Sequence, residues 1–404
     1  PRHALVAAGL LIAYGAWTAI GIPGSESAER AVAELGRIAT LSGILVLALT
    51  LQTRSGAMPA LAGMAASIVG VAVVALAYRV QPAWFSASTE LILPGARGRL
   101  SFPLGYWNGL AALMALGLPL VLAVACSARH AVARASAAAA LPVLVVVVGL
   151  TLSRGGFLLL AMAAVLSVAL GPRRLGAAVL AVSGGALGGI LIAAAYSRGD
   201  LVDGARTTLA SHQGATLIPL ILLAIAAAAG VRVALDRTEA SLTRLVARPP
   251  QAAYAAGAAV LLVLAIGAGA AFDVPGSLRD RWSQFRTPDI PLSQKDRPSR
   301  LASGSGTGRY QFWQAAIKAG NRAPLTGIGA GAYELWWART APVYVFARDA
   351  HSLYLESYAE LGVPGLLLVV AFFVTVLWSG GRRALRGRRG PLRGQRLQAG
   401  CHQR

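Results

Sequence analysis

Charged residues are scarce in this sequence. Only 13% of its 404 residues are Asp, Glu, Lys or Arg, whereas 56% are hydrophobic. Soluble globular chains carry about a quarter charged residues. Several apolar runs also approach the roughly 20 residues that cross a bilayer as a helix. The composition therefore excludes a soluble globular protein and predicts an all-α polytopic membrane protein.

Cysteine is scarce as well. Cys126 lies inside an apolar run and Cys401 lies in the tail, so the pair indicates neither a disulfide framework nor a metal site. The sequence contains no His-Glu-x-x-His, no Asp-x-Asp and no cluster of His and Cys, so we predict no metal and no cofactor. A cleavable signal peptide is not expected, because the first apolar run is full length and lacks a clear cleavage site.

Acidic residues are outnumbered by basic ones. The chain has 16 Asp and Glu against 37 Lys and Arg, a formal net charge of +21. Such an excess can indicate nucleic-acid binding. Here, however, many arginines lie in short connections between apolar runs and in the tail, as the positive-inside bias produces without any polyanion. We therefore predict membrane lipids as partners and no nucleic acid.

Ten apolar runs are candidate membrane helices. Nine fall in residues 1–272 and the last in 353–380. Between them, 273–352 is a large extramembrane loop, and the Arg-rich tail 381–404 is typical of disorder. The runs are 4–22, 38–52, 57–78, 105–127, 135–153, 155–170, 175–196, 214–234, 251–272 and 353–378.

The flanking arginines predict the orientation of the chain. With the N-terminus inside, most short Arg-bearing loops are cytoplasmic, as the positive-inside rule requires. The even number of helices then puts both termini in the cytoplasm. Arg154, between the fifth and sixth runs, lies on the outer side, together with the loop 273–352 and His351. The first loop on that side carries three acidic residues, Glu26, Glu29 and Glu34.

The loop 273–352 is predicted to change character along its length. Up to Gly306 its turn-forming residues indicate an irregular and mobile segment. From Thr307 to Gly320 we expect a helix capped by Thr307, with Arg309 and Trp313 on one face. The aromatic stretch 333–337 is typical of a membrane interface. The loop is thus expected to contain short helices.

His351 stands just before the last apolar run, in Asp349-Ala350-His351-Ser352. One interpretation is an interfacial histidine that hydrogen-bonds a carbonyl group. The other is a general base, because an unperturbed pKa of about 6.5 allows proton transfer near neutral pH. In the second case Asp349 and Glu356 are candidate orienting groups.

Arg154 lies between two apolar runs, in Leu152-Ser153-Arg154-Gly155-Gly156. The simpler interpretation is a snorkelling side chain that marks a helix end. The two glycines favour a phosphate site, because they let a ligand approach the backbone and the next helix offers its N-terminus to an anion. A guanidinium beside that N-terminus would strengthen such a site.

Arg309 opens the predicted loop helix, where it is either a solvated charge or a ligand for an anion. The preceding stretch 304–308 superficially resembles a phosphate-binding loop. It lacks the preceding strand and the Lys-Ser/Thr ending, so no nucleotide site is predicted. A backbone nest for a diphosphate stays open. Arg281, Arg286 and Arg339 compete with Arg309 for the same role.

The stretch Pro103-Leu104-Gly105-Tyr106-Trp107-Asn108 opens the fourth run. An aromatic belt at the membrane surface accounts for most of it. Asn108 lies inside the run and is a candidate for lining a polar pathway.

Four stretches then follow one another along the chain: Ser153-Arg154-Gly155-Gly156; Gly308-Arg309 with Phe312-Trp313; Pro324-Leu325-Thr326-Gly327-Ile328-Gly329; and His351-Ser352, followed after nine residues by Gly362-x-x-Gly365. Together they resemble the O-antigen ligase and O-antigen polymerase superfamily of polytopic bacterial glycosyltransferases. The last spacing is the most specific and is similar to the ligase type. The resemblance extends over roughly residues 100–380.

The resemblance implies that a glycan is transferred from undecaprenyl diphosphate to an acceptor hydroxyl at the outer face of the bacterial cytoplasmic membrane, without metal or nucleotide. It implies that Arg154 and Arg309 hold the diphosphate, that His351 deprotonates or orients the acceptor, and that the three gather at one point. Further candidates for substrate binding are Trp313, Asn108, Arg281 and Arg339. The acceptor, on a lipid core, a glycan or a protein, distinguishes a ligase from a polymerase.

Two other classes stay open. A transporter or flippase for lipid-linked sugars would carry arginines at mid-depth or broken helices in paired halves. Here the key arginines are predicted at helix ends and no internal repeat is evident. An inactive scaffold is the other alternative. The family usually carries about twelve membrane helices, more than the ten predicted from span length, so we expect a truncated or altered C-terminus.

Overall fold

The computed structural model describes residues 2–51, 57–85, 98–171, 173–245, 274–287, 308–343 and 345–389. Every regular element within these ranges is a helix. The chain divides into two compact units. The first comprises Pro1–Gln52, Ala255–Pro291 and Ser303–Arg404, and the second comprises Thr53–Tyr254 and Leu292–Ala302.

Nine of the ten predicted apolar runs are helices in the structure, and the run 251–272 lies outside the described residues. Within the described ranges, eight helices are long and apolar enough to cross a membrane. The helix α6 (Arg154–Leu170) is shorter, at 17 residues. The prediction of an all-α polytopic membrane protein is therefore confirmed.

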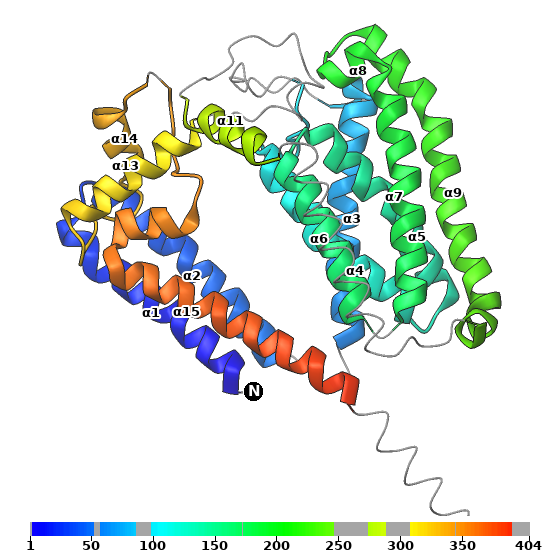
Figure 1. Ribbon diagram of the computed structural model, residues 1–404, viewed down its shortest axis with the longest axis horizontal. Helices are drawn as coiled ribbons and strands as arrows, with labels where there is room; N and C mark the ends of the chain where they lie inside the picture. The colour runs from blue at the N-terminus through cyan, green and yellow to red at the C-terminus, as the bar shows by residue number, and fades with distance from the viewer. Residues whose placement is uncertain are drawn as a thin grey trace, which may run out of the picture. The chain divides into compact units, whose positions relative to one another are not determined.

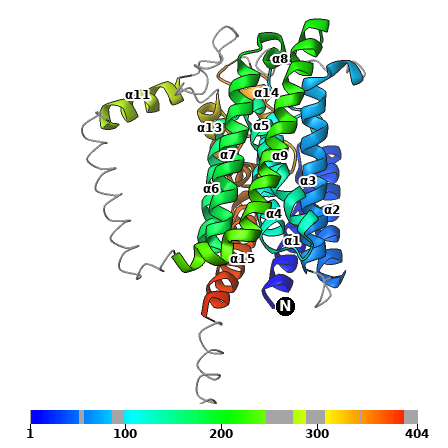
Figure 2. The ribbon, with the colours of Figure 1, turned by 90° about the vertical axis from the view of Figure 1, so that its right-hand side faces the viewer.

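The second unit is a helical bundle built around α5 (Figure 2). Most of α5 from Ala138 to Thr151 is buried, and it packs against α4, α7 and α9. Gly184 and Gly188 of α7 lie so close to Leu141 and Val145 of α5 that Cβ atoms would overlap. Small residues of this kind allow close approach of membrane helices. The helices of this unit are α3 (Ala57–Val80), α4 (Trp107–Ser127), α5 (Ala131–Thr151), α6, α7 (Arg174–Tyr196), α8 (Gly199–Asp203) and α9 (Thr208–Leu245).

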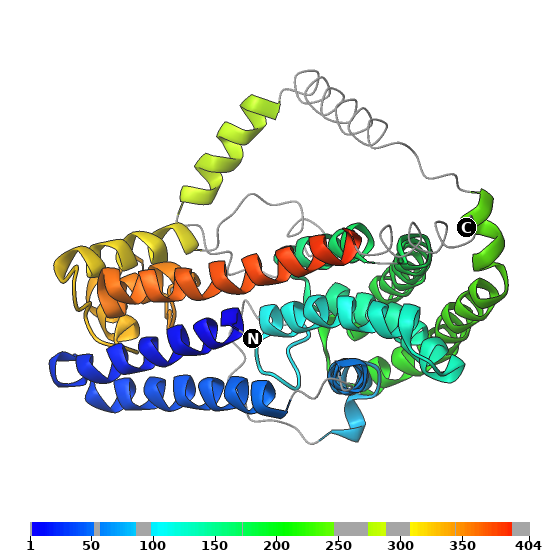
Figure 3. The same cartoon turned by 90° about the horizontal axis from the view of Figure 1, so that it is seen from below.

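The first unit places three long helices side by side, α1 (Arg2–Gly21), α2 (Ala28–Leu51) and α15 (Leu353–Arg389) (Figures 1 and 3). The helix α2 begins ten residues before the predicted run, so Glu29 and Glu34 lie in a helix and not in a loop. The helix α15 continues past residue 380, into the segment predicted as a disordered tail, and residues 390–404 lie outside the description.

Three shorter helices complete the first unit: α11 (Val274–Arg286), α13 (Arg309–Arg322) and α14 (Tyr333–Thr340). The prediction of an irregular segment up to Gly306 is wrong for α11, which is helical. The predicted cap Thr307 lies outside the described residues, and the N-cap of α13 is Gly308, with a φ of 84°. Tyr333, Trp336 and Trp337 are buried in a core with α13, not displayed at a membrane surface as expected.

Candidate functional site

The helix α15 breaks at Gly362, where φ is 67° and ψ is −164°. Glycine alone adopts this backbone conformation readily. A Cβ atom at Gly362 would lie 2.6 Å from the carbonyl carbon of Leu325 and 2.6 Å from the carbonyl oxygen of Pro324. The glycine is therefore needed both for the turn and for the close approach of the stretch 324–331.

The break exposes backbone groups that a continuous helix would pair internally. The stretch 324–331 and one tryptophan supply the missing partners, as membrane helices with interruptions require. The four hydrogen bonds run from Ile328 N to Ala359 O at 2.9 Å, from Gly329 N to Glu360 O at 3.0 Å, from Val363 N to Pro324 O at 2.8 Å and from Trp17 Nε1 to Leu361 O at 3.0 Å. The stretch 324–329 is thus hydrogen-bonded to the backbone of α15 around the break, next to the stretch 362–365.

His351 lies in a turn just before α15 and has a φ of 54°. Non-glycine residues rarely adopt positive φ, and such strain gathers at functional sites. Its ring centroid lies 5.4 Å from that of Phe312 on α13, while one side of the residue is open to solvent. Burial by the surrounding protein, together with the charge of Arg309, holds the pKa of His351 below 6.5, and Asp349 opposes this shift. The neutral imidazole is therefore favoured, which is the form that accepts a proton.

The backbone that carries His351 is fixed by Glu356. Its Oε2 accepts a hydrogen bond from Ala350 N at 2.8 Å, and Ala350 is fully buried. Of the two candidate orienting groups, Glu356 thus acts on the turn and not on the imidazole ring. Asp349 is exposed and influences His351 through its charge. Neither carboxylate forms a hydrogen bond to the ring in the described structure.

Arg309 is the first residue of α13 and is exposed to solvent. Phe312, one turn after Arg309 on α13, contacts the ring of His351, so the structure brings Arg309 and His351 to the same region, where the charge of Arg309 acts on His351. Within the described part of the chain, Arg309 forms no ion pair. A guanidinium at a helix N-terminus beside a neutral imidazole can bind an anion while the imidazole accepts a proton.

The remaining candidates of the first unit are placed differently. Arg339 forms an ion pair with Glu26, so its charge already has a partner. Arg281 is exposed on α11. Trp313 packs against Phe285 of α11, with ring centroids 5.5 Å apart. The structure therefore separates Arg339, which ties two segments together, from Arg309, which is available to a ligand.

Sequence reasoning missed Glu360. Its Oε1 accepts a hydrogen bond from Tyr333 N at 3.0 Å, so it places a carboxylate at the N-terminus of α14. Tyr333 in turn donates its hydroxyl hydrogen to Phe312 O at 2.8 Å. Glu360 thus couples α15 to the core that supports Phe312. An acidic residue inside an apolar run was the available signal.

In the second unit, Arg154 is the first residue of α6 and is exposed. Ser153 caps this helix, because its Oγ accepts a hydrogen bond from Gly156 N at 3.1 Å. The same hydroxyl donates to Asn108 Oδ1 at 2.8 Å. Two predicted residues, Asn108 and Arg154, therefore meet at one helix N-terminus. Arg154 and His351 belong to different units, and their convergence stays a prediction.

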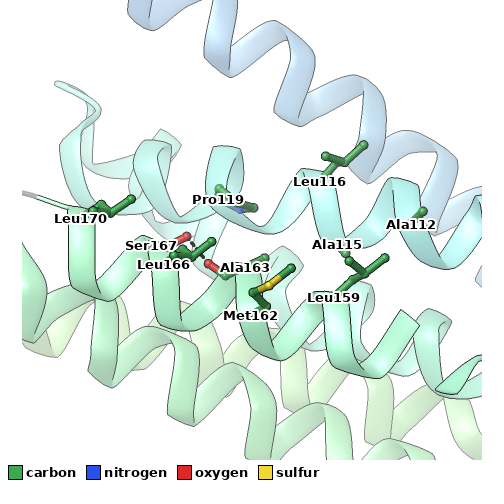
Figure 4. Close-up of a pocket in the computed structure, with 10 residues that line it drawn as sticks. All are labelled: Ala112, Ala115, Leu116, Pro119, Leu159, Met162, Ala163, Leu166, Ser167 and Leu170. Carbon is green, nitrogen blue, oxygen red and sulfur yellow. Dashed lines mark hydrogen bonds between the residues drawn. The ribbon is translucent and has the colours of Figure 1, made fainter. Parts of the chain in front are cut away.

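An apolar groove of about 570 Å³ runs between α4 and α6 (Figure 4). Leu116 and Leu166 on its walls are 69% and 48% exposed, respectively. The groove begins about one turn beyond Asn108 on α4 and Arg154 on α6. Its lining residues are Ala112, Ala115, Leu116, Pro119, Leu159, Met162, Ala163, Leu166, Ser167 and Leu170. An apolar groove that leads to a cationic helix N-terminus matches a lipid with an anionic headgroup.

The described residues include no group of three His, Cys, Asp or Glu side chains arranged to hold a metal ion. The fold and site together define a polytopic helical membrane protein with a histidine and an arginine beside a broken helix.

A family model described as O-antigen ligase matches residues 137–370, more than half of the sequence, and the chain belongs to this family. The resemblance recognised in the sequence is therefore confirmed. Membership indicates a membrane glycosyltransferase of the O-antigen ligase or polymerase type. The matched range includes Arg154, Arg309 and His351. Searches of curated proteins and of solved structures found no match.

Proposed function

We propose that this protein transfers a glycan from undecaprenyl diphosphate to an acceptor hydroxyl at the outer face of the cytoplasmic membrane. The observation that carries the proposal is that α13, with exposed Arg309 at its start, contacts His351 through Phe312, and that burial and the charge of Arg309 hold the pKa of His351 below its ordinary value. A neutral imidazole can accept the proton of an acceptor hydroxyl, and a guanidinium can stabilise a diphosphate leaving group without a metal ion. Family membership supports the substrate class.

In the proposed reaction, His351 accepts the proton of the acceptor hydroxyl as its oxygen bonds to the anomeric carbon of the donor. The bond from that carbon to the diphosphate oxygen breaks, and the diphosphate leaves with the electron pair. Arg309 and Arg154 stabilise the charge that develops on it. Glu356 holds the turn that carries His351. The negative charge of Asp349 raises the pKa of His351 and so partly opposes the effect of Arg309.

The groove between α4 and α6 is proposed to hold the donor's polyprenyl chain. Its lining is almost wholly apolar, and the N-terminus of α6 with Arg154 lies beyond one end. A diphosphate bound there would place the attached chain in the groove. We propose the membrane orientation that the flanking arginines predict, in which both chain termini are cytoplasmic and the site is extracytoplasmic.

The acceptor decides between a ligase and a polymerase of the same family. A lipid core or a protein hydroxyl makes the protein a ligase, and a second glycan repeat makes it a polymerase. A non-enzymatic transporter of lipid-linked sugars is the competing class, and the broken helix α15 is the feature that favours it. A paired broken helix would strengthen that alternative, and none is present among the other helices described.

The test is a transfer assay with purified protein, an undecaprenyl-diphosphate-linked glycan and candidate acceptors. We expect His351→Ala to lower transfer by about 10²–10⁴-fold, and Arg154→Ala and Arg309→Ala to lower it by about 10²–10³-fold. Lys318→Ala, which removes another exposed cation of α13, is the matched control. Full transfer by all three site variants would contradict the assignment. Movement of the lipid-linked glycan without transfer would favour the transporter.

A further inference from the structure

Four aromatic rings gather between α11 and α13, and only Trp313 among them is a substrate-binding candidate from the sequence. Phe285 is central: its ring centroid lies 5.6 Å from that of Trp282, 6.3 Å from Tyr310 and 5.5 Å from Trp313. Trp282 and Phe285 are stacked, with an interplanar angle of 16°. Trp282 nevertheless stays 52% exposed. We call the rings of Trp282, Phe285, Tyr310 and Trp313 the aromatic platform.

The platform is fixed to α13 by polar contacts as well as by ring packing. Gln311 Nε2 donates to Arg286 O at 2.7 Å and ties the end of α11 to α13. Gln314 Nε2 donates to the hydroxyl oxygen of Tyr310 at 2.7 Å. The guanidinium carbon of Arg286 lies 5.6 Å from the Trp282 ring centroid. Exposed Trp282 and the half-buried rings of Phe285, Tyr310 and Trp313 are thus held by packing and bordered by hydrogen-bonding groups.

The platform adjoins the residues of the proposed reaction. Tyr310 follows Arg309 directly, and Trp313 lies one helical turn after Arg309 on the same side of α13. Phe312 of the same helix contacts the ring of His351. A diphosphate bound by Arg309 would therefore carry its sugar close to these rings.

We propose that the aromatic platform is a saccharide-binding subsite for the sugars that follow the diphosphate of the donor; this rests on the proposed function. Sugar rings present C–H groups on their faces and hydroxyls at their edges. Exposed rings with Arg, Gln and Tyr polar groups around them match both features. The polar border also distinguishes the platform from a membrane anchor, because the side chains exposed beside Trp282 on α11 are Arg281, Ser283 and Gln284.

The first experiment measures saccharide binding without transfer. The probe is the set of water-soluble oligosaccharides released by mild acid from the host's polyprenyl-linked glycans, added to the full chain in nanodiscs. A titration followed by saturation-transfer NMR should give a Kd that Trp282→Ala and Tyr310→Ala raise about tenfold, a loss of roughly 1.4 kcal/mol. Trp282→Phe, which keeps an aromatic face, should retain most of the affinity.

The matched control is Trp378→Ala. Trp378 on α15 is 56% exposed and has Arg382 over its ring, so it repeats the Trp282–Arg286 pair outside the platform. Its replacement should leave saccharide binding unchanged. An equal loss in this variant, or no loss in Trp282→Ala and Tyr310→Ala, would overturn the proposal.

A second measurement separates the subsite from a membrane anchor. Brominated lipids quench tryptophans that lie in a bilayer, and the difference between wild type and Trp282→Phe isolates the contribution of Trp282. We expect no quenching of that contribution, whereas strong quenching would assign the platform to the membrane. In the transfer assay, Trp282→Ala should raise the donor KM about tenfold with little change in kcat. Saccharide binding without any transfer would reject the enzyme but keep the subsite.

Discussion

Arg154 in the helical bundle and Arg309 in the short helices of the first unit occupy the same position in their helices but are supported by different contacts. Each is the first residue of its helix. Arg154 follows Ser153, whose hydroxyl is held by Asn108 and caps α6. Arg309 follows Gly308, which has no side chain to cap α13 and turns through a positive φ. One cation thus depends on a side-chain network, and the other on backbone geometry.

The difference follows from what surrounds each arginine. Apolar packing along long helices stabilises the bundle, so the N-terminus of α6 needs only the hydrogen bonds of Ser153 and Asn108. The helices α13 and α14 are short, and long-range contacts stabilise this part of the first unit, from Glu360 to Tyr333 and from the break at Gly362 to the stretch 324–331. We therefore expect the proposed site around His351 and Arg309 to be more sensitive to single backbone changes than the N-terminus of α6.

Among the changes that compare the surroundings of the two arginines, the largest fall in kcat is expected from Arg309→Gln. Loss of one charge that stabilises the leaving group should lower kcat by about 10²–10³-fold. The remaining activity should also change its pH dependence. The wild-type rate should fall only when the pH drops below 6.5, because burial and Arg309 hold the pKa of His351 below that value. Without Arg309 the pKa rises, so the acid limb of the rate profile should move to higher pH.

Lys318→Gln is the control for that experiment, because Lys318 is an exposed cation on the same helix. Its acid limb should coincide with that of wild type. An acid limb that does not move in Arg309→Gln would show that Arg309 does not act on the pKa of His351.

The next effect concerns the break in α15. Gly362→Ala forces a side chain into a conformation and a space that only glycine fits, at a cost of about 1–3 kcal/mol for the conformation alone. We expect a lower melting temperature and loss of transfer. Gly380→Ala, on the same helix with open space around its Cβ position, should be neutral. Equal melting temperatures of the two variants would show that the fold does not depend on glycine at the break in α15.

A smaller effect is expected at Glu356. Glu356→Gln keeps an oxygen that can accept the hydrogen bond from Ala350, whereas Glu356→Ala removes it. One such bond is worth about 0.5–1.5 kcal/mol. We therefore expect kcat to fall by about three- to tenfold in the alanine variant and to recover in the glutamine variant. Equal losses in both variants would show that the charge, and not the bond to the turn, matters.

The smallest effect is expected at the cap of α6. Ser153→Ala should cost about 1 kcal/mol, because the helix N-terminus loses its cap and Arg154 loses part of its support. The donor KM should rise about fivefold, with kcat nearly unchanged. Ser183→Ala on α7, whose hydroxyl bonds within its own helix, is the control. A fall in kcat alone would place Ser153 in the chemistry and not in donor binding.

Hydrophobic runs made the membrane helices predictable, because a span of apolar residues has few other structures available. The spacing of His351 and Gly362 likewise indicated the family. The aromatic stretch that begins at Tyr333 was predicted to be interfacial, but it is buried, because buried and interfacial aromatic residues have the same local sequence pattern. Glu360 could not be assigned a partner, because Tyr333 lies 27 residues away and only the folded chain brings them together.

A crosslink between the two units tests most directly whether Arg154 and His351 share one diphosphate site. Gly155→Cys, in open space beside Arg154, is combined with Ser352→Cys, beside His351, in a chain without Cys126 and Cys401. Val182→Cys, 72% exposed on α7, replaces Gly155→Cys in the control pair. We predict that a short bismaleimide joins residues 155 and 352 but not 182 and 352, and that undecaprenyl diphosphate protects the first pair. Failure of residues 155 and 352 to crosslink, with both cysteines reactive, would contradict a single shared diphosphate site.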